Sequence, residues 1–143
     1  MIRFILVATF VILFLILSIP LLLIEWIIGK FNMDLKDRSS QKIVNWAFRV
    51  CLFLAGTSVT VIGQEKVPTD RAVLYVGNHR SYFDIIITYA RCPRLTGYIA
   101  KKDMEKVPLL RTWMRRLHCL FIDRENVKEA LKTILSLIHI SEP

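Results

Sequence analysis

The sequence predicts an α/β domain preceded by an amino-terminal membrane-anchoring helical segment. Two observations carry this prediction. Residues Phe4 to Ile24 include no charged side chain, and at ~1.5 Å per residue a helix of this length reaches across the hydrocarbon core of a bilayer. After Ala55, short runs of β-branched or aromatic residues alternate with amphipathic helical patterns, which is the order typical of α/β domains.

The overall composition agrees with this division. The chain has 143 residues, of which 54% are hydrophobic, and a formal net charge of +8; its mean hydropathy is +0.44. Disordered chains are poor in apolar residues, so this composition excludes a disordered protein. We expect membrane-anchoring helices over residues 1–56, which leaves about a hundred residues or fewer for one small domain.

The first apolar run is interpreted as a membrane helix that Pro20 is able to kink. A cleavable signal peptide fits poorly, because its apolar region is shorter and ends at a small-residue cleavage site. A buried core helix of a soluble domain is the alternative. The cations Lys30, Lys36, Arg38 and Lys42 follow the run. By the positive-inside rule they place the rest of the chain on the cytoplasmic side of the cell membrane.

A second apolar segment, Ile43 to Ala55, is too short to span a bilayer comfortably. We expect it to lie in the interface or to fold back against the first helix, giving a two-helix anchor. Cys51, Cys92 and Cys119 form no close pair, and their odd number argues against a disulfide framework. No histidine has neighbours with metal-ligand spacing, so neither a metal nor another cofactor is expected.

The domain elements are expected in the following order. Strands at Ser58 to Ile62 and Ala72 to Val76 flank a turn-rich loop. A helix at Ile85 to Ala90, a strand at Gly97 to Ala100, a helix at Leu109 to Leu117, a strand at Leu120 to Ile122 and a helix from Val127 onward follow. Pro108 suits the first turn of the helix expected at Leu109 to Leu117. Asn126 and Glu129 have the spacing of a capping box for the last helix.

Residues that are able to take part in acid–base chemistry follow the second expected strand. They lie in the segment Gly77-Asn78-His79-Arg80-Ser81-Tyr82-Phe83-Asp84. On one continuous helix His79 and Asp84 would point about 140° apart. If Ser81 caps a helix that begins at Tyr82, His79 stays on the loop and can fold back toward Asp84. An aspartate that binds one imidazole nitrogen leaves the other as a base for a substrate hydroxyl. The alternative role for Asp84 is a capping box with Ser81.

Three blocks of this sequence resemble the glycerolipid acyltransferases, and the 1-acyl-sn-glycerol-3-phosphate acyltransferase family in particular. Asn78-His79 and Asp84, with four residues between, resemble the NHxxxxD motif. Ala100 to Met104 with Val107 to Leu109 resemble the second block, and Phe121-Ile122-Asp123-Arg124 resemble the third. The resemblance covers roughly Gly63 to Ile134. It implies a glycerolipid-acyltransferase-type α/β domain, of which residues 57–134 form the amino-terminal part.

The resemblance also implies roles for single residues. His79 is the expected general base and Asp84 its orienting partner, in transfer of an acyl group from acyl-carrier protein or acyl-CoA to the sn-2 hydroxyl of lysophosphatidic acid. Arg124 is expected to bind the acceptor phosphate, because a guanidinium matches phosphate oxygens. Lys101, Lys102 and Asn78 are further candidate substrate contacts; the alternative for the two lysines is a solvated strand end.

Other readings of the function stay open at this point. A relative could acylate glycerol 3-phosphate or another lysophospholipid, and a non-catalytic membrane-binding module could use the same cations to hold anionic lipid. A nucleic-acid partner is not expected, because no nucleic-acid-binding motif occurs and the cations flank an apolar segment. An acidic carrier protein as acyl donor would be attracted by the same charge.

The carboxyl end departs from the family pattern. A fourth block, Pro-Glu-Gly-Thr-Arg, is expected beyond Ile134 and does not occur, so we expect the domain to be incomplete and its activity to be doubtful. Leu135 to Pro143 looks like a translated sequencing-library adaptor and is interpreted as a non-native tail. The alternative is a natural helix end, since Leu137 and Ile138 continue the preceding apolar stripe.

Overall fold

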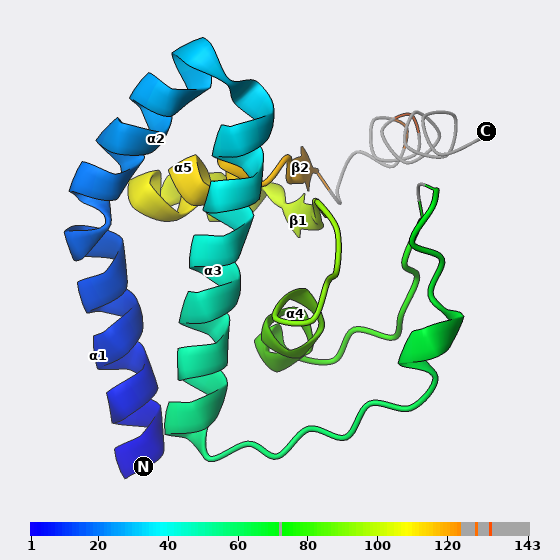
Figure 1. Cartoon of the computed structure of the whole chain (residues 1–143). Coiled ribbons are helices and arrows are strands. Elements are labelled where there is room, and N and C mark those ends of the chain that lie inside the picture. Colours follow the sequence, from blue (N-terminus) through cyan, green and yellow to red (C-terminus); the bar gives the residue numbers. More distant parts are fainter. Residues whose placement is uncertain (72, 124–127, 129–131, 133–143) are drawn as a thin grey trace.

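The computed structural model describes residues 1–71, 73–123, 128 and 132. Three amino-terminal helices lead into a long connection, a short helix and a small βαβ unit (Figure 1). Apart from residues 128 and 132, the expected helix from Val127 lies outside the described residues, and so do its capping box and the expected tail. Within the described residues the chain is mostly helical, and its sheet has two strands.

The first apolar run forms two helices with a bend between them, close to Pro20, where the sequence allows a kink. Helix α1 covers Ile2–Leu17 and α2 covers Ile19–Phe31, with Ser18 between them. Pro20 lies in the first turn of α2, where its missing N–H costs least. No single helix in the described part of the chain combines the length and hydropathy needed to cross a bilayer; α1 and α2 meet that requirement only together, as a pair bent by 48°.

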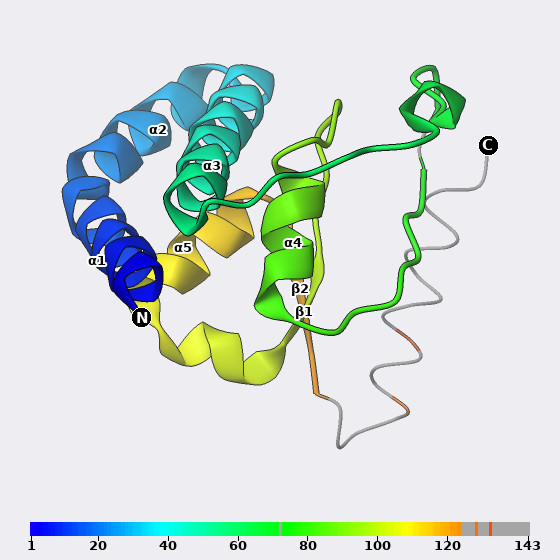
Figure 2. The ribbon, with the colours of Figure 1, turned by 90° about the horizontal axis from the view of Figure 1, so that it is seen from below.

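Helix α3, Met33–Ala55, folds back along α1 and α2 and contacts α4 with another part of its surface (Figures 1 and 2). Asn32 begins it, with a side-chain oxygen that accepts a hydrogen bond from the Leu35 N–H at 2.9 Å. Gly56 ends it in the left-handed conformation, with φ 64°, which glycine adopts without steric cost. Of the two placements expected for the second apolar segment, the return onto the first is the one that the helix contacts show. The anchoring role stays a prediction.

The α/β character is confined to one βαβ unit. Strand β1 covers Ile99–Lys101, the 3₁₀ helix η2 covers Lys102–Lys106, helix α5 covers Pro108–Arg116 and strand β2 covers Leu120–Ile122. The two strands are parallel, with Ala100 opposite Phe121. The two strands and α5 lie at or within a few residues of the positions that the sequence predicts, whereas the sequence does not predict η2. A Cβ on Gly97 would come within 2.4 Å of the His118 carbonyl oxygen, so this close approach requires glycine.

Two expected strands do not form. Residues 58–62 and 73–76 lie outside the helices and strands of the structure, in a long connection that also holds the 3₁₀ helix η1, Gln64–Lys66, and Ala72 is not described. Ile62 is 93% exposed and Val76 is 87% exposed. A β-branched run becomes a strand only where a neighbouring strand pairs with it, and the two-stranded sheet does not extend to these segments.

The hydrophobic core is shared between the amino-terminal helices and the βαβ unit. Its buried members come from α2, α3, α4 and the end of α5: Leu22, Val44, Tyr89, Trp113 and Leu117. Phe14 packs beside this cluster, with its ring centroid 5.8 Å from that of Trp113. Residues on both sides of position 56 therefore fold around one core.

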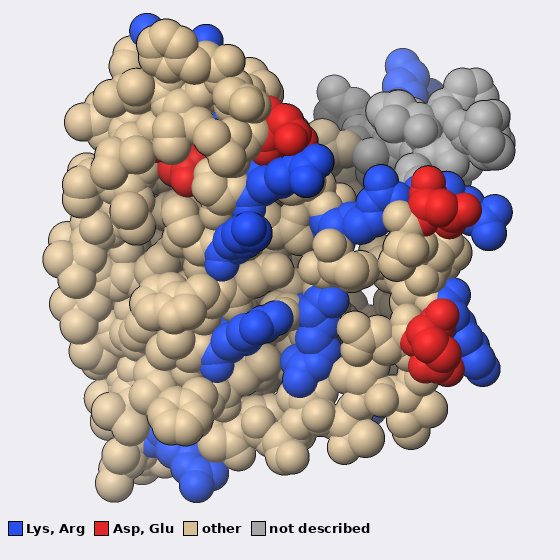
Figure 3. Space-filling model, in the orientation of Figure 1, with Lys and Arg blue, Asp and Glu red and all other residues tan. Residues whose placement is uncertain are grey.

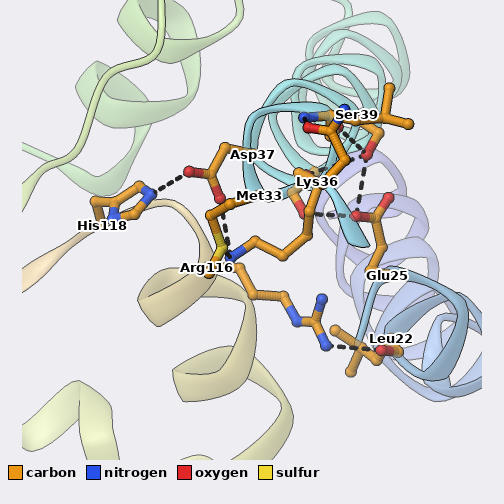
Figure 4. A network of polar contacts seen from close by, with 11 residues as sticks. Leu22, Glu25, Met33, Lys36, Asp37, Ser39, Arg116 and His118 are labelled. Carbon is orange, nitrogen blue, oxygen red and sulfur yellow. Dashed lines mark hydrogen bonds and ion pairs between the residues drawn. The ribbon is translucent and has the colours of Figure 1, made fainter. Parts of the chain in front are cut away.

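A polar seam accompanies this core where α5 meets α2 and α3 (Figure 4). Nε2 of His118 lies 2.8 Å from Oδ2 of Asp37, and Nζ of Lys36 lies 3.0 Å from Oδ1. Burial acts to raise the pKa of Asp37, but hydrogen bonds from His118 and Lys36 outweigh it and hold that pKa below its usual value. Arg116 Nη2 donates to the Leu22 carbonyl at 2.6 Å.

The outer face of α1 and α2 is almost free of charge. Figure 3 shows that Lys and Arg gather over the middle and the opposite side of the molecule, whereas the surface over these two helices carries charge mainly near its ends. Large apolar side chains are exposed along both helices, among them Phe4, Ile12, Leu17, Leu23, Ile24 and Trp26. Such a continuous apolar surface is uncommon on a protein that meets only water.

Candidate active site

The candidate site begins where the long connection enters helix α4, Tyr82–Tyr89. Ser81 is the N-cap in an extended conformation, and its Oγ accepts a hydrogen bond from the Phe83 N–H at 3.2 Å. Asp84 at the third helical position completes a reciprocal capping box. The helix therefore starts at Tyr82, as the capping alternative requires, and not at Ile85, where the apolar pattern places its start. His79 remains on the preceding loop.

Asp84 binds the loop through a single carboxylate oxygen. Its Oδ2 accepts hydrogen bonds from the backbone N–H groups of Arg80 at 2.6 Å and Ser81 at 2.7 Å. Nδ1 of His79 lies 3.4 Å from the same oxygen. The Ser81 and Arg80 N–H groups, in this order of effect, hold the pKa of Asp84 below its usual value. The carboxylate is thus ionised at neutral pH.

The capping contact of Asp84 and its approach to His79 therefore occur together. The same oxygen closes the capping box and faces the imidazole, because the loop turns back over the first turn of α4. The side chains of both residues are partly exposed, His79 by 49% and Asp84 by 37%, so a substrate can reach them. An imidazole with Nδ1 toward a carboxylate is held in the tautomer that leaves Nε2 to accept a proton.

The sequence does not reveal every group that holds this loop. The backbone N–H of Arg80 makes the shortest hydrogen bond to Asp84, yet a backbone contact does not depend on the identity of its side chain. Asn78, the other motif residue, is exposed in the loop. The motif therefore singles out Asn78, whereas nothing in the sequence points to the backbone contact of Arg80.

Lys101 lies at the end of β1 and Lys102 at the start of η2. Each forms an ion pair with a carboxylate other than that of Asp84. Nζ of Lys101 is 2.5 Å from Oδ2 of Asp103, and Nζ of Lys102 is 3.5 Å from Oδ2 of Asp123. The contacts to Lys101 and Lys106 lower the pKa of Asp103 to about 2. The structure thus joins His79 to Asp84, and it places the two lysines in ion pairs of their own.

A pocket of about 510 Å³ opens beside β2 and is lined by Lys102, Arg115, Asp123 and Lys132, among others. The next residue after Asp123 is Arg124, which lies outside the described residues, so its predicted contact with a phosphate has no geometry here. The pocket carries cations and carboxylates together. It is large enough for a phosphate group, and the described cations at its edge are of the kind that bind one.

A partly exposed histidine beside an ionised aspartate, at the capped start of a helix, defines a candidate general-base site. A family model described as Acyltransferase matches residues 58–142. The match covers more than half of the chain and includes His79 and Asp84, so the chain belongs to this family. The resemblance noted in its sequence blocks is thereby confirmed.

Three curated relatives bear closely similar names. The chain is 33% identical over 82 residues to the "Probable 1-acyl-sn-glycerol-3-phosphate acyltransferase" of Mycoplasma pneumoniae, covering 54% of this chain and 30% of the relative. It is 28% identical over 98 residues to the 1-acyl-sn-glycerol-3-phosphate acyltransferase of Bacillus subtilis, covering 67% and 49%. The enzyme of the same name from Borreliella burgdorferi is 26% identical over 95 residues, covering 64% and 37%.

The chain thus spans between about a third and a half of the length of these relatives. No solved structure matches the chain. The family assignment rests on sequence, and the geometry of the candidate site rests on the contacts described above.

Proposed function

We propose that this chain belongs to an enzyme that transfers a fatty acyl group to the sn-2 hydroxyl of 1-acyl-sn-glycerol 3-phosphate, forming phosphatidic acid. The observation that carries the proposal is the 3.4 Å approach of His79 Nδ1 to Asp84 Oδ2 at the capped start of α4. The names of the similar proteins supply the acceptor. The acyl donor is acyl-carrier protein or acyl-CoA.

In the proposed reaction His79 acts as general base. Its Nε2 takes the proton of the acceptor hydroxyl as the hydroxyl oxygen attacks the thioester carbonyl. The tetrahedral intermediate then collapses, the carbon–sulfur bond breaks, and the sulfur leaves with the proton that His79 returns. Asp84 stabilises the imidazolium that forms between these two steps. No acyl group is attached to the protein in this scheme, and the products are the new ester and the free thiol of the donor.

The acceptor phosphate needs cationic partners. Arg124 is the proposed principal contact, with Lys101 and Lys102 as helpers at the same phosphate or at those of the donor. The position of Lys102 at the pocket beside β2 supports this assignment. Binding would exchange the present ion pairs of these lysines for phosphate contacts.

The proposed location is the cytoplasmic surface of the cell membrane, with α1 and α2 in contact with lipid. The exposed apolar side chains of both helices support lipid contact, and Figure 3 shows how little charge interrupts that face. Trp113 of α5 donates a hydrogen bond to Ser18 between the two helices. A contact from the domain to the middle of the apolar run favours helices that lie in one leaflet over helices that cross the bilayer.

The test is acyl transfer by the full-length protein in phospholipid vesicles, with lysophosphatidic acid, glycerol 3-phosphate and other lysophospholipids as acceptors. His79→Ala should abolish transfer and leave vesicle binding intact, while His118→Ala, a histidine change in the turn between α5 and β2, should retain turnover per folded molecule. Retained transfer by purified His79→Ala would refute the assigned base. Transfer only to another acceptor would correct the substrate, and vesicle binding without any transfer would indicate a non-catalytic membrane module.

A further inference from the structure

The connection that carries His79 has little hydrophobic packing to hold it. It runs from the end of α3 to the start of α4, and Ile62 and Val76 within it are almost fully exposed. A segment of this length that buries few apolar side chains gains little free energy to offset the entropy of ordering it. Its position therefore depends on a small number of polar contacts.

One arginine supplies two of these contacts from a distant part of the chain. Nη1 of Arg94, in the loop after α4, donates hydrogen bonds to the carbonyl oxygens of Thr69 at 2.7 Å and Arg71 at 3.1 Å. Among the described residues, these are the hydrogen bonds that tie residues 57–76 to a distant part of the chain. Because the guanidinium binds two carbonyl oxygens of the segment, it fixes the direction of the segment as well as the distance between the segment and Arg94.

The backbone of Arg94 is itself anchored to helix α3. Nε2 of Gln41 donates to the Arg94 carbonyl at 2.6 Å, and Gln41 is only 7% exposed. Oγ1 of Thr96 donates to the same carbonyl at 2.8 Å. Because Gln41 is fixed within α3, Arg94 projects from a rigid support and is not a freely moving surface side chain.

The opposite end of the same connection is held by Asp84, through the N–H groups of Arg80 and Ser81. His79 therefore lies between two fixed points, one at Thr69 and Arg71 and the other at the start of α4. Only seven residues separate Arg71 from His79. Loss of the hydrogen bonds at Thr69 and Arg71 is therefore expected to displace the backbone that leads to His79.

We infer that Arg94 is a positioning residue for His79: it clamps the entering side of the loop, and Gln41 couples that clamp to the amino-terminal helices. This inference rests on the proposed function for its kinetic consequence, but the clamp itself is a structural claim. Small displacements of a general base cost much of its rate, since proton transfer requires the donor and acceptor within hydrogen-bond reach. The clamp should therefore affect turnover more than affinity.

The clamp can be tested without any assay of activity. Trypsin cleaves after lysine and arginine, and the carbonyl of Arg71 that it must attack is bound by Arg94. In Arg94→Ala, cleavage after Arg71 should rise by about fivefold relative to cleavage after Lys66, which serves as an internal reference. Arg91→Ala is the matched control. Within the described residues, the hydrogen bond of the Arg91 side chain goes to the Ile87 carbonyl four positions earlier, and its replacement removes the same charge and one trypsin site.

The kinetic arm uses the same variants in vesicles. Arg94→Ala should lower kcat by about tenfold with the acceptor KM within about twofold of normal, Arg94→Lys should recover part of the loss, and Arg91→Ala should change neither value. An unchanged cleavage ratio in Arg94→Ala would overturn the clamp. A raised KM at unchanged kcat would also overturn the inference, since it would make Arg94 a substrate contact. Failure of the proposed function appears separately, as transfer that survives His79→Ala.

Discussion

The indole N–H of Trp113 donates a hydrogen bond of 2.9 Å to the hydroxyl of Ser18, and both side chains are almost completely buried. Ser18 is the residue at which the apolar amino-terminal run changes direction. Its hydroxyl also donates to the Leu15 carbonyl at 2.9 Å. The bend between α1 and α2 is thus bonded directly to helix α5 of the βαβ unit.

This hydrogen bond predicts a measurable coupling between the two helical regions. Trp113→Phe and Ser18→Ala each remove it, at a cost of about 1 kcal/mol apart from their own packing losses. Because the bond can be lost only once, the double variant should be less destabilised than the sum of the two by about 1 kcal/mol. Chemical unfolding in detergent measures the three free energies. Strict additivity would show that the bond contributes nothing.

The capping role of Asp84 predicts a specific pH dependence. Its pKa is lower in the folded chain than the ordinary value of 3.8, chiefly through the N–H groups of Ser81 and Arg80. The stabilisation is therefore complete above the unfolded pKa and is lost as the pH falls through the folded pKa. Asp84→Asn should lower Tm at neutral pH and converge on the unmodified protein at strongly acidic pH. Parallel curves at all pH values would contradict this assignment.

The backbone at His118 predicts an unusual order of variants. His118 has φ 55°, in the left-handed region, which costs a residue with a Cβ about 1 kcal/mol relative to glycine. His118→Gly and His118→Ala both lose the contact with Asp37, so their difference isolates the backbone. The glycine variant should be the more stable of the two by about 1 kcal/mol. Equal stabilities, or a more stable alanine variant, would show that position 118 relaxes its φ.

The proposed phosphate contact predicts a kinetic separation between the two substrates. Arg124→Ala should raise the acceptor KM or lower acyl transfer, with little effect on saturation by the acyl donor. Arg124→Lys should recover part of the activity, because it keeps the charge but loses the bidentate fork. Initial rates with each substrate varied in turn provide the measurement. An effect confined to donor saturation would remove Arg124 from the acceptor phosphate.

Local signals predicted the site better than they predicted the fold around it. The start of α4 follows from Ser81 and Asp84, which lie three residues apart and satisfy the first turn of the helix by themselves. The start of α5 follows in the same way from Pro108. Both signals act within one helical turn, so they do not depend on how the rest of the chain is arranged.

The features that the sequence did not predict all depend on distant partners. Residues 58–62 have the composition of a strand but no neighbour to pair with. Pro20 predicts that the first apolar run can kink, but the hydrogen bond that holds the bend at Ser18 comes from a side chain 95 positions away. The clamp on the loop likewise joins Arg94 to Thr69. The residue pattern of one segment does not reveal which distant residue will contact that segment in the folded chain.

The shared core has a practical consequence for anyone preparing this protein. Leu22 and Val44 lie on the helices that a biochemist would remove first to obtain a water-soluble enzyme, and they pack on Tyr89 and Trp113. Cutting the chain after residue 56 would uncover those two aromatic rings and also remove Gln41, which supports Arg94. The shortened product should precipitate and not behave as a free-standing domain, so purification calls for keeping the amino-terminal helices intact.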